Sequence, residues 1–320
     1  MSHGWWEVER LLRYVGKRLV LMLVSLWLIA SLTFVLMHSI PGDPFTSEKK
    51  LPKQTLENLK AKYGLDKPLP AQYVQYMGNL VKFDLGISIK STTRTVNDIL
   101  EEGFPVSAHL GIQSILVALA AGIVMGMIAA SRQNQLSDYF LMVLAVIGLS
   151  VPAFVLAPLF QKYFGMKWNL LPVWGWGEFD KTILPSIVLA FSPLALVTRL
   201  TRSSMLEVIG QDYIRTARAK GLPPIRVMSR HTLRNAIIPV VTIMGPLTAA
   251  ILTGSFVVEQ IFAIPGLGKY FVESITNRDY PVIMGVTIFY SAFLIVMNFL
   301  VDLLYGWIDP RIKLGGKEAG

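Results

Sequence analysis

Hydrophobic positions gather into six long apolar stretches separated by polar segments. The stretches run roughly over residues 17–38, 105–130, 137–160, 182–202, 236–262 and 281–307. Each is long enough to cross about 30 Å of hydrocarbon as a helix, which takes about 20 residues. Because a backbone in lipid must satisfy its own hydrogen bonds, helix is the expected form. The pattern predicts an all-α membrane protein with about six transmembrane helices.

The first stretch follows four cations, Arg10, Arg13, Lys17 and Arg18, as the apolar part of a signal peptide would. Its apolar run is too long for a signal peptide, and no small-residue cleavage site follows it. We therefore expect an uncleaved first helix.

Charge sets the expected orientation. With the N-terminus in the cytoplasm, the inside segments carry 16 Lys and Arg against seven acidic residues, and the outside segments carry 14 against 13. The short outside loops are poor in cations, as the positive-inside rule requires. Both termini are therefore expected in the cytoplasm.

This topology divides the chain into four expected regions. They are a cytoplasmic N-terminus with the first helix (1–38), an extracytoplasmic loop region (39–104), a five-helix core (105–307) that contains a basic cytoplasmic loop (203–235), and a cytoplasmic tail (308–320). A helix-like run from Ala71 to Lys82 lies in the extracytoplasmic region.

Composition narrows the function. The chain is 53% hydrophobic and only 16% charged, which disfavours a soluble enzyme. It has no cysteine, and its four histidines show no paired metal-ligand spacing. The net charge of +9 is explained by orientation in a membrane, so lipid is expected as a partner and nucleic acid is not.

Catalytic motifs are missing from the sequence. There is no phosphate-binding G-x-x-x-x-G-K-[ST] and no H-E-x-x-H, and Gly266-Leu267-Gly268-Lys269 is interpreted as a turn. Charged residues within the stretches are rare, and Glu259 and Asp302 near their ends are expected to be structural. We therefore expect no catalytic residue, no metal and no bound cofactor, and the energy for any transport must come from elsewhere.

The basic cytoplasmic loop predicts a short helix of about nine residues. Asp212 is the expected N-cap, Gly221 the expected left-handed residue after the helix, and Pro223 and Pro224 stop it. One face would carry Tyr213, Thr216, Ala217 and Lys220. A second helix follows, with a basic stripe suited to phospholipid headgroups at Arg226, Arg230 and Arg234.

Two interpretations of this loop remain. It either only fixes orientation, or it fits a groove on a soluble partner as a helix does. In the second interpretation the small residues Ala217, Ala219 and Gly221 would permit close approach.

The segment from Arg215 to Gly221 resembles the EAA loop of permease subunits of binding-protein-dependent ABC importers. That consensus reads E-A-A-x-x-x-G and ends later in I-x-L-P. Ala217 and Gly221 match it, Arg215 replaces the Glu, and Thr216 replaces the first Ala. The terminal part is similar to Asn235-Ala236-Ile237-Ile238-Pro239, five residues later than the consensus. The run from Asp212 to Gly221 resembles the peptide-permease branch of this family.

Further segments agree with that branch in order along the chain. They are Pro41-Gly42-Asp43-Pro44, Tyr63-Gly64-Leu65-Asp66-Lys67-Pro68, Asp84-Leu85-Gly86, Glu259 to Gly268, Asp302-Leu303-Leu304-Tyr305 and Asp309-Pro310-Arg311. The resemblance is to the first permease subunit of oligopeptide or dipeptide importers.

The resemblance implies a multi-pass permease of the cytoplasmic membrane that itself does no bond chemistry. It would pair with a second homologous permease subunit and two ATPase subunits that bind ATP and Mg. An extracytoplasmic substrate-binding protein would deliver peptide. The ATPase-coupling helix would comprise Asp212, Tyr213, Arg215, Ala217, Arg218, Ala219 and Gly221.

Three features of the apolar stretches predict a candidate path, helix kinks and close helix packing. Small hydroxyl side chains make the fifth stretch a candidate translocation path, at Thr242, Thr248, Thr253 and Ser255. Prolines 152, 158, 193 and 246 are expected to kink their helices. Gly122-x-x-x-Gly126 would allow close helix packing.

Other functions stay open at this point. Within the family, nickel, glutathione or an oligosaccharide could replace peptide as the substrate. A self-sufficient carrier or channel is a different class, and an intramembrane enzyme is a third. Transport by the chain alone would favour a carrier.

Overall fold

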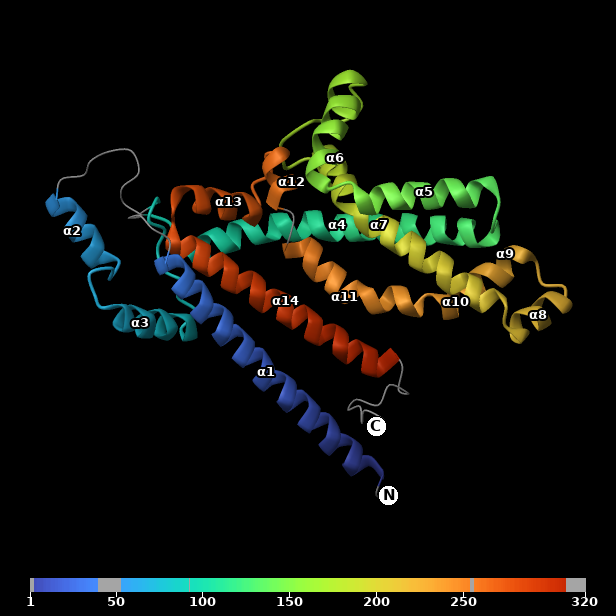
Figure 1. Cartoon of the computed structure of the whole chain (residues 1–320), viewed down its shortest axis with the longest axis horizontal. Coiled ribbons are helices and arrows are strands. Elements are labelled where there is room, and N and C mark those ends of the chain that lie inside the picture. The colour runs from blue at the N-terminus through green and yellow to red at the C-terminus, as the bar shows by residue number, and fades with distance from the viewer. Residues whose placement is uncertain (1–2, 40–52, 92, 254–255, 309–320) are drawn as a thin grey trace. The chain divides into compact units, whose positions relative to one another are not determined.

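The computed structural model describes residues 3–39, 53–91, 93–253 and 256–308, and within those ranges the chain is built of helices (Figure 1). Backbone contacts divide it into two compact units. The first runs from the N-terminus to Phe104 and resumes at Tyr270, and the second is Pro105–Lys269. The last helix thus groups with the N-terminal unit, whereas the sequence-based division counts it in the core 105–307.

Among the described residues, four helices are long and apolar enough to cross a membrane. They are Val15–Ser39 within α1 (His3–Ser39), α4 (Val96–Ser131), α7 (Phe179–Ile209) and Tyr280–Leu300 within α14 (Tyr280–Ile308). These helices confirm the predicted stretches 17–38, 105–130, 182–202 and 281–307. Two bent helix pairs raise the candidate crossings to as many as six. The described chain is therefore an all-α membrane protein.

The third stretch is not one straight helix. It comprises α5 (Leu136–Ser150), α6 (Ala153–Phe160) and the π-helix η1 (Gln161–Lys167), and the chain bends by 109° after α5. Val151 is extended before Pro152, as a residue that precedes proline prefers. The kink expected at Pro152 is therefore confirmed, and this pair of residues ends α5 within the predicted stretch 137–160.

The fifth stretch is also divided. The segment Pro224–Ala236, which ends in α10 (Leu233–Ala236), meets α11 (Ile238–Thr253) at a bend of 56°. A separate short helix, α12 (Phe256–Ile261), follows after residues 254–255, which lie outside the described ranges. The predicted span 236–262 is therefore carried mainly by α11.

In the second unit, glycines let two helices approach α7 closely. A Cβ at Gly122 would lie 3.0 Å from the Leu194 carbonyl oxygen, and one at Gly126 would lie 2.8 Å from that of Thr198. Gly148 of α5 meets α7 in the same way, where a Cβ would lie 2.8 Å from the Ala195 Cβ. The predicted close packing at Gly122-x-x-x-Gly126 is confirmed.

A buried carboxyl group organises the turn after α12. Both oxygens of Glu259 accept hydrogen bonds, one from the Ser107 hydroxyl (2.8 Å) and one from the Gly268 N–H (2.8 Å). The Ser107 oxygen also accepts from the Leu267 N–H (2.9 Å). These contacts cap the N-terminus of α13 (Leu267–Asn277), where a carboxylate is favoured. Glu259 thus has the structural position expected. The interpretation of Gly266 to Lys269 as a turn needs a correction, because Leu267, Gly268 and Lys269 already form the first turn of α13.

In the first unit, α1 and α14 pack against each other and run antiparallel (Figure 1). His38 at the end of α1 lies 6.4 Å, between ring centroids, from Tyr280 at the start of α14. The N-terminal end of α1 and the C-terminal end of α14 therefore face the same side. Two short helices, α2 (Lys53–Lys62) and α3 (Leu69–Val81), also belong to this unit, and α3 confirms the helix predicted from Ala71 to Lys82.

Candidate functional site

The predicted short helix in the basic loop is α8 (Asp212–Ala219), which follows α7 directly in the chain. Its underside is apolar: Ile214 and Ala217 are buried and pack with Val227 of the following segment. Val208 and Leu222 close the cluster from either side. A helix of eight residues is marginal in water, so this small core of its own chain is what holds it in place.

Gly221 ends α8 as the sequence predicts. Its φ of +71° is left-handed, its N–H donates to the Arg218 carbonyl (2.9 Å), and the Leu222 N–H donates to the Ala217 carbonyl (3.4 Å). This pair of bonds is the Schellman motif, and the apolar contact between Leu222 and the Ala217 cluster belongs to it. The turn sends the chain into Pro223 and Pro224.

The start of α8 differs from the prediction. Gln211 is the N-cap, it makes no side-chain cap hydrogen bond, and Asp212 is already the first helical residue. The Asp212 carboxylate lies 3.6 Å from Arg215, and both side chains are largely exposed. Asp212 still favours the positive end of the helix dipole.

The predicted contact face needs a correction at one residue. Tyr213, Thr216 and Lys220 are exposed, but Ala217 is only 6% exposed and faces its own chain. The helical pattern placed Ala217 with its neighbours because it could not tell which side the rest of the loop covers. The face that remains available comprises Asp212, Tyr213, Arg215, Thr216, Arg218, Ala219, Lys220 and Gly221.

The segment after the prolines is helical but irregular. It consists of α9 (Pro224–Arg226), the π-helix η2 (Val227–Thr232) and α10. Arg226, Arg230 and Arg234 are all exposed, as expected for a basic stripe. The Asn235 amide donates to the Tyr213 hydroxyl (2.7 Å), which ties α8 to this segment a second time.

An ion pair that the sequence did not single out lies in the helices next to the loop. Arg202 of α7 donates two hydrogen bonds to Asp138 of α5, at 2.6 Å and 2.7 Å. The Asn134 N–H donates to the same carboxylate (3.0 Å), and Asp138 is 2% exposed. Such bidentate pairs are geometrically rigid. The available signal was one acid and one base, each at the expected cytoplasmic end of an apolar stretch.

The candidate path residues are not gathered into a site. Thr242 is exposed and donates to the Ile238 carbonyl (2.9 Å), whereas Thr248 is half-buried further along α11. The side chain of Thr253 and the whole of Ser255 lie outside the described residues. Pro246 lies inside α11. The assignment of a translocation path to these residues stays a prediction.

Comparison with known proteins adds a separate line of support. Residues 122–314 match the family described as binding-protein-dependent transport system inner membrane component, and residues 11–111 match the N-terminal region of such components. The chain is 53% identical to the dipeptide transport system permease protein of Bacillus subtilis over 95% of its length and 99% of the relative's. It is 45% identical to a dipeptide permease of Lactococcus lactis, over 95% and 100% of the two chains. It is 41% identical to the oligopeptide transport system permease protein of Salmonella typhimurium, also over 95% and 100%.

Proposed function

The chain belongs to the family of binding-protein-dependent transport system inner membrane components, and we propose that it forms part of the path through which an ATP-driven importer brings short peptides into the cell. It is a multi-pass protein of the cytoplasmic membrane. Peptide is favoured over nickel, glutathione or an oligosaccharide because its relatives are named dipeptide and oligopeptide permeases.

The proposed assembly contains more than this chain. A second homologous permease would complete the path, two ATPase subunits would bind ATP and Mg, and an extracytoplasmic binding protein would deliver the peptide. The basic loop would face the cytoplasm, because short cytoplasmic loops carry the excess of Lys and Arg. Because α1 and α14 are antiparallel, the N-terminal end of α1 and the C-terminal end of α14 would lie on one side of the membrane, which charge predicts to be the cytoplasm.

The proposed coupling mechanism rests on one observation. One side of α8 packs against its own chain, and the opposite side is exposed. Ile214 and Ala217 fix its underside to Val227, while Arg215, Thr216 and Arg218 face outward. We call residues 203–235 the coupling loop. A helix packed in this way can transmit a force from a bound subunit without losing its conformation. It follows α7 in the chain, and the ion pair between Arg202 and Asp138 links α7 to α5.

The energetics set one requirement on this mechanism. ATP shifts the permease between two states only if the ATP-bound ATPase subunits bind one state with higher affinity than the other. A rigid coupling loop lets that difference reach the spans as a displacement of α7. A flexible loop would deform instead, and α7 would not be displaced.

The test compares two alanines that lie two positions apart on α8. Ala219→Glu places a charge on the exposed face, so the permease should fold normally but lose the ATPase subunits on co-purification and lose peptide uptake. Ala217→Glu buries a charge in the loop core, so the permease itself should be less stable. Normal ATPase co-purification and normal peptide uptake in Ala219→Glu would refute the proposal that the exposed side of α8 binds the ATPase subunits.

A further inference from the structure

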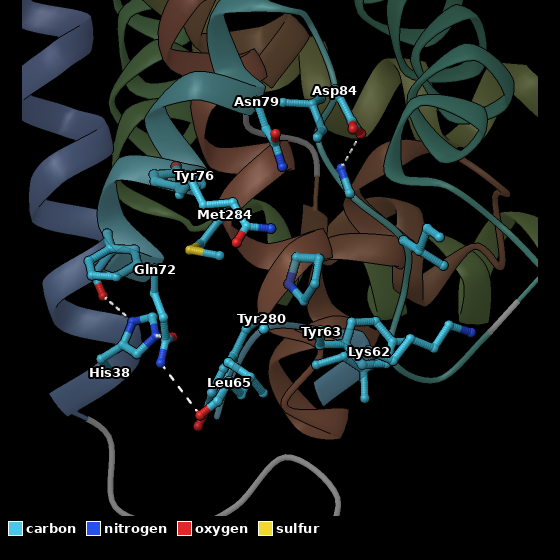
Figure 2. A pocket seen from close by; sticks show the side chains of 18 residues that line it. His38, Lys62, Tyr63, Leu65, Gln72, Tyr76, Asn79, Asp84, Tyr280 and Met284 are labelled. Carbon is cyan, nitrogen blue, oxygen red and sulfur yellow. Dashed lines mark hydrogen bonds between the residues drawn. The ribbon is translucent and has the colours of Figure 1, made fainter. Parts of the chain in front are cut away.

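The first unit contains a cavity of about 330 Å³ with a polar wall that is bonded within the chain (Figure 2). The amide nitrogen of Gln72 donates to the Lys67 carbonyl (2.7 Å) and to the Leu65 carbonyl (3.5 Å). Its amide oxygen lies 3.0 Å from a ring nitrogen of His38. The Tyr76 hydroxyl is buried away from solvent. These groups are therefore not available to a ligand.

A surface feature of the second unit is of a different kind, because the segment between α5 and α7 exposes large apolar and aromatic side chains. The segment comprises α6, η1 and residues 168–178. In η1, the following loop and the first residue of α7, six such residues are 38–73% exposed: Tyr163, Met166, Trp168, Leu170, Trp174 and Phe179. Large apolar groups exposed together in one segment indicate contact with a partner or with lipid.

These side chains project from a backbone that is fixed by hydrogen bonds. The Gln161 amide nitrogen donates to the Val173 carbonyl (2.8 Å) and to the Ile261 carbonyl (3.1 Å). The Gly175 N–H donates to the Phe262 carbonyl (3.0 Å). The loop is therefore tied to η1 and to the end of α12, and its aromatic side chains are exposed from a formed structure.

The length of α5 brings the chain to the far edge of the hydrocarbon. α5 runs along α7, which it meets through the ion pair of Asp138 with Arg202 at the expected cytoplasmic end. It meets α7 again where Gly148 approaches Ala195. The 15 residues of α5 and the two extended residues that follow reach about 28 Å, close to the ~30 Å thickness of the hydrocarbon core. The chain thus arrives at the outer boundary of the lipid tails as α6 begins.

The bend of 109° then turns α6 and η1 away from the direction of the span. A helix that leaves a span at close to a right angle runs along the membrane surface and does not cross the membrane. Figure 1 shows α6 turning sharply from the direction of α5. Leu156 and Ala157 of α6 pack with Leu184 near the start of α7, so the turned helix stays attached to the outer end of the bundle.

The exposed apolar series of α5 is continued by α6. Phe140, Val143 and Val146 of α5 are each more than half exposed, as on the lipid-facing side of a span. Phe154 and Leu159 of α6 are exposed in the same way. The turned helix therefore extends the apolar surface that the span presents to lipid.

The residue types of the segment are those of the boundary between lipid tails and headgroups. Trp and Tyr are enriched at this boundary because their rings are apolar and carry one polar group. Lys162 and Lys167 are exposed, and each places its Nζ 5.7 Å from the centroid of the Tyr163 ring. Neither lysine pairs with an acidic side chain among the residues that the structure describes. Their charges are opposite to those of lipid phosphates, and their apolar stems can lie among the tails.

We propose that α6, η1 and residues 168–178 form an anchor in the outer lipid interface of the membrane. α6 and η1 lie along the membrane surface, and Trp168 and Trp174 lie at the level of the headgroups. Of the predicted stretch 137–160, α5 is then the part that crosses. Lipid fits the segment better than a second protein, because protein interfaces are depleted of lysine, whereas a lysine at a lipid surface reaches the phosphates.

The absence of cysteine lets a single spin label report the depth of each position in the membrane. Met166→Cys and Leu170→Cys carry the label in the proposed anchor, and Val143→Cys carries it in the middle of α5 as the matched control. All three native residues are more than half exposed, so the label displaces no packed group.

The assembled importer is placed in lipid nanodiscs, with and without its binding protein. Electron paramagnetic resonance measures how often each label collides with oxygen, which concentrates in lipid tails, and with a nickel complex, which stays in water. Lipids labelled at the headgroup and in the middle of the acyl chain calibrate the depth. Both anchor labels should lie within about 5–10 Å of the headgroup level. The Val143→Cys label should lie about 10 Å deeper, since seven helical residues separate it from the end of α5.

Three results would overturn the anchor. Anchor labels as deep as the Val143→Cys label would show that α6 and η1 enter the membrane core. Labels that collide with the nickel complex as freely as a label in water would show that the segment stands outside the lipid. Labels shielded from both probes, in the importer alone or after the binding protein is added, would show that protein covers the segment.

Discussion

At the scale of single residues, Gly221 controls how α8 ends. A Cβ at this position would meet no atom within 4 Å, so space does not require glycine. The requirement comes from the backbone, because φ is +71° and the left-handed region costs other L-residues about 1–2 kcal/mol each. Asparagine tolerates that region better than β-branched residues do.

This difference gives the first prediction for the coupling loop. Gly221→Val should disturb the Schellman turn and lower the ratio of peptide imported to ATP hydrolysed, whereas Gly221→Asn should keep most of it. The ratio is measured in proteoliposomes that contain the assembled importer. Equal ratios in wild type and Gly221→Val would show that the turn does not transmit the ATPase movement.

The sequence could predict some residues of the loop and not others, for a physical reason. Gly221 is predictable because left-handed backbone depends on local geometry. Asp212 was misplaced by one position because its side chain does not cap, and helix ends drift by one or two residues. Ala217 was placed on the contact face because its burial depends on Val227, ten residues away, and periodicity does not report which face is covered.

At the scale of elements, the crossing of α4 and α7 depends on a glycine with no room for a side chain. A Cβ at Gly126 would lie 2.5 Å from the Cβ of Thr201 and 2.8 Å from the Thr198 carbonyl oxygen. Real Cβ atoms do not approach so closely, and the backbone oxygen cannot swing away. Any larger residue must therefore separate the helices.

Gly126→Ala should accordingly destabilise the purified permease by about 1–3 kcal/mol, as overpacking does. Ala120→Val adds two methyl groups at an exposed position of the same helix and should have little effect. Thermal unfolding in detergent, followed by size-exclusion chromatography, measures both variants. A melting temperature for Gly126→Ala that equals wild type would show that α4 and α7 can separate without loss of stability.

Prolines show why helix boundaries within the spans were harder to predict than the helices themselves. Pro193 lies inside the uninterrupted α7, and Pro158 lies inside α6, yet Pro152 stands at the 109° bend. Each removes one backbone donor, and whether the helix then continues depends on the packing around it. Pro152 differs in that Val151 before it is extended, a choice that the sequence alone does not reveal.

At the scale of the whole molecule, hydropathy predicted the fold class because lipid constrains a chain more strongly than water does. It did not predict that the last helix groups with the first, since that depends on contacts between distant segments such as His38 and Tyr280. Orientation is a prediction of charge alone and needs its own test.

The absence of cysteine from the chain makes that test direct. Val81→Cys lies at the end of α3 on the expected outside, Ile225→Cys lies in the coupling loop, and Leu116→Cys lies in the middle of the lipid-crossing part of α4. The three side chains are 81%, 79% and 61% exposed within the chain, so differences in labelling depend on which side of the membrane, or how deep in the lipid, each residue lies.

In intact cells a membrane-impermeant maleimide should label Val81→Cys alone. Ile225→Cys should react only after permeabilisation, and Leu116→Cys in neither case, because a thiolate does not form in hydrocarbon. Labelling of Ile225→Cys in intact cells would contradict the predicted orientation and remove the coupling loop from the side of the membrane where ATP is.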